Sequence, residues 1–92
     1  TEARRGLPEF VGPYRIVSLI GEGSSGRVYE AHDPSTGRRV ALKWLRADAP
    51  PDMRAMFLGE AQLAARVEHP HVCPIFATGQ EYERPYIVMR LY

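Results

Sequence analysis

Residues 14–45 read YRIVSLIGEGSSGRVYEAHDPSTGRRVALKWL, and this stretch decides the fold. Residues 14–20 and 27–31 are rich in β-branched and aromatic side chains, and the glycine cluster at residues 21–26 separates them. This pattern predicts an antiparallel hairpin with a glycine-rich connection. The segment DPSTG is dense in turn-forming residues, so the apolar run that follows at residues 38–45 is predicted to form a third antiparallel strand.

The second half of the chain predicts one helix and two further strands. Asp52 is a suitable N-cap for residues 53–67, which are good helix formers. The segment HPH at residues 69–71 ends this helix, because proline disfavours helical geometry in the residue before it. Apolar stretches at residues 72–77 and 85–91 predict two more strands. We therefore expect an α+β domain with a five-stranded antiparallel sheet and one long helix.

Residues 1–13 contain two glycines and two prolines without apolar periodicity. We expect them to form a loose tail that becomes ordered near Phe10 and Val11, so that the domain itself spans residues 14–92.

Charge and cysteine content exclude several classes of function. Twelve basic and eleven acidic side chains give a formal net charge of +1, too little for general binding of nucleic acid or of an anionic membrane. Cys73 is the one cysteine and has no partner for a disulfide or at metal-ligand spacing, so no metal site is expected. No apolar run is long enough to span a bilayer. A cytoplasmic domain is expected, whether or not its parent protein carries a membrane anchor.

Gly21, Gly23 and Gly26 form the pattern GxGxxG directly after a predicted strand. Glycines in such a loop let backbone N–H groups approach phosphate oxygens closely. A Walker A loop would need Gly-Lys-Ser/Thr where this chain has GRV. A dinucleotide-binding fold would need a helix after the third glycine and an acidic residue about 20 positions further on. The chain meets neither condition, so another kind of phosphate site and a plain flexible hairpin both remain open.

Lys43 is the only lysine, since the other eleven basic side chains are arginine. Strand alternation places Ala41 and Lys43 on one face of the sheet and Val40, Leu42 and Trp44 on the other. Taken alone, Lys43 is more simply interpreted as a solvent-exposed strand lysine.

Glu60 changes that interpretation because it lies in the middle of an apolar helix stripe. The stripe is formed by Met53, Met56, Phe57, Leu63, Ala64 and Val67. A carboxylate that faces a core is costly unless a cation or hydrogen-bond donors meet it, and Lys43 is the nearest unexplained cation by strand order. The alternative is a glutamate that bends out to solvent. A helix glutamate that holds a strand lysine near a glycine loop would position phosphate groups.

Four segments together resemble the N-terminal lobe of a protein kinase, in particular the bacterial Ser/Thr kinases of eukaryotic type. They are GEGSSGRVYEA, VALK, FLGEAQLAARVEHPHV and PYIVMRLY, in the order and spacing of that family. The resemblance implies that Lys43 binds the α and β phosphates of ATP and that Glu60 holds Lys43. It further implies an ATP site made by the loop residues Gly21, Glu22, Gly23, Ser24, Ser25 and Gly26, the adenine roof Ile20, Val28 and Ala41, the gatekeeper Met89, and the hinge backbone of Arg90 and Tyr92.

The resemblance implies that the parent protein is an ATP-dependent Ser/Thr kinase that acts on proteins. The chain stops at Tyr92, within the expected hinge, and contains no His-Arg-Asp catalytic loop and no Asp-Phe-Gly metal motif. The catalytic base and the Mg²⁺ ligands would then belong to a C-terminal lobe, and residues 1–92 alone are expected to be inactive. Arg90 replaces an acidic residue common in relatives, which affects selectivity more than ATP binding. A pseudokinase or interaction module, and a small-molecule kinase of related fold, remain alternatives.

The surface that a C-terminal lobe normally covers would be exposed around Val67, Met89 and Leu91. Exposed apolar patches of this kind tend to acquire a partner, so self-association or a bound partner protein is expected. Alternatively, the N-terminal tail folds back over this surface and covers it with Leu7, Phe10 and Val11.

Overall fold

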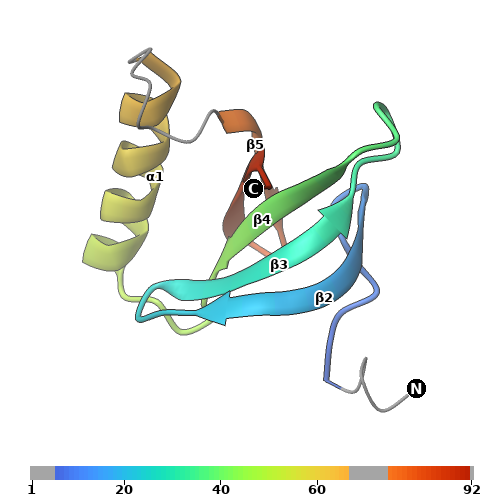
Figure 1. Ribbon diagram of the computed structural model, residues 1–92. Helices are drawn as coiled ribbons and strands as arrows, with labels where there is room; N and C mark the ends of the chain where they lie inside the picture. Colours follow the sequence, from blue (N-terminus) through green and yellow to red (C-terminus); the bar gives the residue numbers. More distant parts are fainter. Residues whose placement is uncertain (1–5, 67–74, 92) are drawn as a thin grey trace.

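The computed structural model of the chain describes residues 6–66 and 75–91, and for residues 60–66, 75 and 76 it describes the backbone alone. These residues form one antiparallel sheet and one helix (Figure 1). The elements are β1 Phe10–Val11, β2 Tyr14–Glu22, β3 Gly26–His32, β4 Arg39–Leu45, α1 Pro51–Arg66, β5 Ile75–Glu81 and β6 Arg84–Arg90. The strands lie in the order β1-β2-β3-β4-β6-β5. The predicted α+β class is confirmed, with six strands instead of five.

The additional strand is β1, which lies in the predicted tail at the two residues near which the tail was expected to become ordered. Val11 pairs with Tyr14 on β2 and is fully buried. The turn between them contains Gly12, whose φ of 57° is a conformation that glycine adopts without strain. The Gly12 N–H donates a hydrogen bond of 2.8 Å to the carboxylate of Glu81 on β5. This hydrogen bond therefore links the two edge strands of the sheet.

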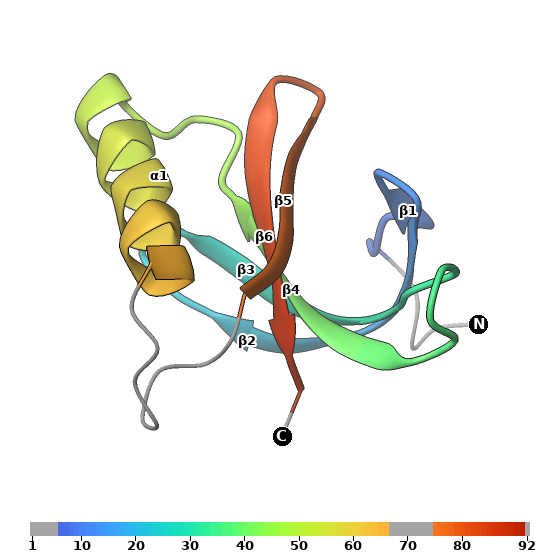
Figure 2. The same cartoon turned by 90° about the horizontal axis from the view of Figure 1, so that it is seen from above.

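The sheet carries a separate buried cluster on each face. The larger cluster lies on the face away from α1 and contains Val11, Tyr14, Ile16, Tyr29, Ala31, Val40, Leu42, Trp44, Tyr86 and Val88. The smaller cluster joins Leu45 and Ile87 of the sheet to Phe57 of α1. Strand β4 thus directs Trp44 to one face and Leu45 to the other, as the predicted alternation requires. Figure 2 shows α1 and β1 on opposite sides of the molecule.

The two clusters contradict the alternative in which the N-terminal tail covers the surface around Met89. Leu7 packs against the larger cluster, to which Val11 also belongs, whereas Met89 packs against the smaller cluster beneath α1. Phe10 remains 49% exposed. The N-terminal segment therefore completes the other face of the sheet.

Helix α1 begins at Pro51, one residue before the predicted cap, so the prediction of Asp52 as N-cap is wrong. Proline suits the first helical position because its missing N–H would be unpaired there. Asp52 lies within the first turn, where its charge is favourable near the positive end of the helix dipole. The predicted end of the helix at Val67 and the HPH segment lie outside the described residues.

Only part of the predicted apolar stripe of α1 is buried. Phe57 is buried and Met53 packs beside it, but Met56 is 67% exposed and is therefore not a core residue. The side chains of Glu60, Leu63, Ala64 and Val67 lie outside the part of the chain whose side chains are described. The Arg54 guanidinium adds a hydrogen bond to the Glu83 carbonyl at the β5–β6 turn. Within residues 6–66 and 75–91, no helix is long and apolar enough to cross a membrane.

The connection between β5 and β6 is tighter than predicted. Residues 78–81, predicted to be a connection, belong to β5, and Glu81 pairs directly with Arg84. The chain reverses at Tyr82 and Glu83, whose φ values of 53° and 61° are both positive. Two such residues in sequence are typical of a type I′ turn, which asparagine and glycine usually form. The predicted start of this strand at Val72 lies outside the described residues.

Candidate functional site

Lys43 lies in the middle of β4, on the face of the sheet that α1 covers. Its cross-strand neighbours are Val28 on β3 and Ile87 on β6, and Val28 pairs in turn with Gly21 on β2. One row across the sheet therefore joins the first glycine of the loop to the lysine. The Lys43 ammonium also lies 5.6 Å from the centroid of the Phe57 ring on α1, where it meets the aromatic face.

A groove of about 400 Å³ opens beside Lys43, between the glycine loop and the helix. Ser24 and Ser25 of the loop line one side of the groove. The beginning of α1 lines the other side, with Asp52, Met53, Met56 and Phe57. The groove thus lies between a glycine-rich turn and the first turns of a helix, and the Lys43 ammonium supplies its positive charge.

Of the residues predicted to surround adenine, Val28 lies beside Lys43, and Ala41 and Met89 lie one row further along the same face. Ala41 pairs with Met89 on β6 and is buried, and Met89 is partly buried. Ile20 is 47% exposed and lies at an irregularity of β2, where the pairing shifts register between Leu19 and Gly21. Arg90 is exposed at the end of β6. Tyr92 and the side chain of Glu60 lie outside the residues that the structure describes.

The three loop glycines differ in what the fold requires of them. A Cβ atom on Gly26 would lie 2.0 Å from the carbonyl oxygen of Trp44, so β3 and β4 can approach only if this residue is glycine. A Cβ atom on Gly23 would meet nothing within 4 Å, and one on Gly21 would meet only the Val28 Cβ at 4.0 Å. None of the three has a positive φ. The fold therefore explains Gly26, which the sequence pattern treats as one of three equal glycines, and does not explain Gly21 or Gly23.

Arg46 holds the outer side of the glycine loop, a role that the sequence did not indicate. Its backbone N–H donates to the Ser25 carbonyl at 2.9 Å, and its guanidinium donates to the Ser24 carbonyl at 3.1 Å. The same guanidinium forms an ion pair of 2.8 Å with Asp48. The hydrogen bond and charge of Arg46 lower the pKa of Asp48 below its ordinary value.

This arrangement defines a class of protein. A twisted antiparallel sheet with a glycine turn, a lysine in the middle of the third long strand and a helix over the same face is the architecture of a kinase N-terminal lobe. The chain is similar in fold to the kinase domain of PknI from Mycobacterium tuberculosis, solved as a double mutant, with a TM-score of 0.70 and 28% identity. The likeness covers 89% of this chain and 34% of that chain.

The chain belongs to the protein kinase family, because the family model of the protein kinase domain matches residues 14–92. It is 44% identical over 82 residues to the DNA damage-responsive serine/threonine-protein kinase RqkA of Deinococcus radiodurans, covering 87% of this chain and 12% of RqkA. It is 41% identical over 92 residues to the serine/threonine-protein kinase PknE of Mycobacterium bovis, covering 98% of this chain and 16% of PknE. The resemblance inferred from the sequence is thereby confirmed, and the chain spans a small fraction of the relatives it matches.

Proposed function

We propose that this chain is the ATP-binding lobe of a Ser/Thr protein kinase whose parent protein transfers the γ-phosphate of ATP to protein hydroxyl groups. The observation that carries the proposal is the row that joins Gly21, Val28 and Lys43 on the face covered by α1. Gly21 and Gly23 add to it, since the fold gives no reason for glycine at either position. A ligand that approaches the backbone of the loop supplies that reason. The ATP requirement of such a kinase also favours a cytoplasmic location.

In this proposal each part of the face contacts a different part of ATP. Lys43 binds the α and β phosphates, and the backbone N–H groups of residues 21–26 cover the phosphate chain. The apolar side chains of Ile20, Val28 and Ala41 form the roof over adenine, with Met89 as gatekeeper. The backbone of residues 90–92 pairs with the edge of the base.

Glu60 is proposed to hold Lys43 in place for the phosphates. It lies three residues after Phe57 on α1, and residues with this spacing share one face of a helix. The Phe57 ring already contacts the Lys43 ammonium. The same face of α1 therefore carries Glu60 one turn further along, which supports a Lys43–Glu60 ion pair in the active arrangement.

Magnesium enters this proposal through the remainder of the parent kinase. In the described part of the chain, no group of three or more His, Cys, Asp or Glu side chains is placed to hold a metal ion. Residues 1–92 also contain no His-Arg-Asp or Asp-Phe-Gly segment. We therefore expect purified residues 1–92 to bind ATP weakly and to transfer no phosphate to protein.

The test is a titration of ¹⁵N-labelled residues 1–92 with MgATP, followed by NMR chemical shifts. Shifts are expected at residues 21–26, Ala41 and Lys43. Lys43→Met is expected to weaken binding roughly 10- to 100-fold, because a charge-assisted contact contributes about 1.5–3 kcal/mol. Arg38→Met is the control, since it removes the same charge from an exposed position at the β3–β4 turn.

Two results would contradict the proposal in different ways. Absence of shifts around Lys43 at millimolar ATP, or equal affinity in Lys43→Met, would show that this face is not a nucleotide site. A parent protein that binds ATP through Lys43 but transfers no phosphate would instead identify a pseudokinase and overturn only the enzymatic part.

A further inference from the structure

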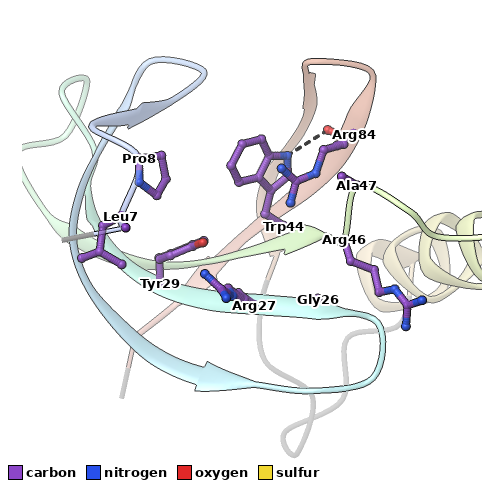
Figure 3. Close-up of a pocket in the computed structure, with 10 residues that line it drawn as sticks. Leu7, Pro8, Gly26, Arg27, Tyr29, Trp44, Arg46, Ala47 and Arg84 are labelled. Carbon is purple, nitrogen blue, oxygen red and sulfur yellow. Dashed lines mark hydrogen bonds between the residues drawn. The ribbon is translucent and has the colours of Figure 1, made fainter. Parts of the chain in front are cut away.

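A second pocket lies on the face of the sheet away from Lys43 (Figure 3). Its volume is about 500 Å³. Leu7 and Pro8 of the N-terminal segment form one wall, Tyr29 of β3 lies at the base, and Trp44 and Arg84 form the opposite wall. Trp44 follows Lys43 in β4, so this pocket and the nucleotide groove lie on opposite faces of one strand. Of the residues that line this pocket, only Gly26 also belongs to the proposed nucleotide site.

Arg84 is held in the pocket by three contacts. The centre of its guanidinium lies 3.6 Å from the centroid of the Trp44 indole ring, and its Nε donates to the Leu45 carbonyl at 2.8 Å. The Trp44 indole N–H donates in turn to the Arg84 carbonyl at 3.3 Å. A guanidinium carries five N–H donors, and the Nε bond uses one of them. The remaining four N–H donors are on the two terminal nitrogens, which these contacts hold in a fixed orientation.

Arg84 differs from the other two arginines at this pocket in its ion pairing. Arg27 forms an ion pair of 2.8 Å with Glu22, and Arg46 forms one of 2.8 Å with Asp48. Among the side chains that the structure describes, no ion pair involves Arg84. The pocket therefore carries one uncompensated positive charge.

Burial makes this uncompensated charge costly. Desolvation lowers the pKa of Arg84, the electrostatic interaction with Tyr29 opposes this shift, and repulsion from Arg27 adds to it. An arginine nevertheless stays protonated at physiological pH, so the cost cannot be relieved by loss of a proton. A carboxylate whose two oxygens accept hydrogen bonds from the two terminal nitrogens would offset this cost, because planar, two-point pairing is the strongest form of the arginine–carboxylate interaction.

We propose that this pocket, the Arg84 pocket, binds a peptide segment of a partner protein that presents a carboxylate beside an apolar side chain. The single uncompensated charge matches a carboxylate of charge −1 better than a phosphate of charge near −2. Leu7 and Pro8 are partly buried and provide the apolar surface for the neighbouring side chain. The volume lies in the range of ordinary ligand pockets.

Trp44 makes the proposal measurable, because it is the only tryptophan of the chain and its fluorescence reports on the Arg84 pocket. The probe is the blocked peptide acetyl-Ala-Leu-Glu-Leu-Ala-amide, compared with the peptide in which glutamine replaces glutamate. Saturable changes in Trp44 emission are expected with the glutamate peptide. The glutamine peptide is expected to bind at least tenfold more weakly, and added salt should reduce the difference.

Two variants locate the binding site. Arg84→Gln is expected to abolish the difference between the two peptides. Arg38→Gln lowers the net charge equally at the distant β3–β4 turn and is expected to preserve the difference. MgATP is expected to leave peptide binding unchanged, because the nucleotide groove lies on the other face.

The peptide comparison on the unaltered chain decides the proposal even if Arg84→Gln does not fold. Equal affinity for the glutamate and glutamine peptides would overturn it, as would binding of neither. Tighter binding of the matching phosphoserine peptide would overturn the assignment to a carboxylate. Loss of the difference in Arg38→Gln would show that general charge attraction, and not the Arg84 pocket, binds the peptide.

Discussion

Replacement of Gly26 by alanine should strongly destabilise the fold, although the sequence pattern gives Gly26 the same role as Gly23. The added Cβ would lie 2.0 Å from the Trp44 carbonyl oxygen and 3.1 Å from the Leu45 Cα. Real Cβ contacts are essentially never shorter than 3.0 Å, so β3 and β4 must separate by the difference, 3.0 − 2.0 = 1.0 Å. The obstructing atoms belong to backbone, which cannot rotate aside.

The magnitude follows from overpacking and from the hydrogen bonds beside Gly26. Overpacking costs about 1–3 kcal/mol. Two hydrogen bonds, from Gly23 N–H to the Gly26 carbonyl and from Arg46 N–H to the Ser25 carbonyl, each contribute about 1 kcal/mol and would be strained. We expect a loss of about 3–5 kcal/mol, which corresponds to a fall in Tm of roughly 12 °C or more for a domain of this size.

The assay is urea unfolding followed by Trp44 fluorescence and far-UV circular dichroism, with Gly23→Ala as the matched control. Gly23→Ala adds the same methyl group in open space and should change the free energy of unfolding by less than about 1 kcal/mol, in the stabilising direction. If Gly26→Ala unfolds within about 0.5 kcal/mol of the unaltered chain, the contact with Trp44 does not explain the glycine, and the argument fails.

Four further predictions concern other parts of the molecule. Hydrogen bonds from Ser35 lower the pKa of Asp33 below 3.8, so the Asp33 carboxylate stabilises the fold above that pH, and this stabilisation is lost as the pH falls through the folded-state pKa. In urea unfolding between pH 2 and 6, Asp33→Asn should remove the part of the pH dependence of the midpoint that this carboxylate causes. Glu81→Ala should cost about 1.5–3 kcal/mol and speed amide exchange at Gly12, whereas unchanged exchange would exclude the link between edge strands. A structure of the parent protein with bound nucleotide should place Lys43 and Glu60 within 4 Å, and a Lys43 that points to solvent there would refute the proposed positioning role. Sedimentation of residues 1–92 should show self-association that increases with concentration. A monomer at all concentrations would contradict the expected self-association.

The alternation of β4 explains why the sequence predicted which side chains share a face of the sheet with Lys43. Successive strand residues point to opposite faces, so the assignment of residues 38–45 to a strand already separated Lys43 from Trp44. The pairing of that strand with β3 and β6 then brought Val28 and Ile87 beside the lysine. The alternation and the β3–β4 pairing follow from local pattern and from the turn residues between these two strands, whereas the β4–β6 pairing joins segments distant in sequence and comes from the structure.

Features that depend on contacts distant in sequence could not be predicted in this way. The turn at Tyr82 and Glu83 lacks glycine and asparagine, and it is supported by the Trp44–Tyr82 ring contact at 6.4 Å and by the bond from Arg54 to the Glu83 carbonyl. Strand β1 has only two residues and is stabilised by burial of Val11. Neither feature leaves a periodic pattern in the chain.

The glycine loop is anchored at its base and open at its tip, and this difference bears on how it would bind a nucleotide. Gly26 lies against the Trp44 carbonyl, and Ser25 is bonded to the backbone of Arg46, so the base of the loop moves together with β4. Lys43 belongs to the same strand. The distance from the base of the loop to the lysine is therefore set by the β3–β4 ladder before any ligand arrives. A site that is already ordered loses less entropy on binding, so under the proposed function only the residues near Gly23 would need to adjust to the phosphates.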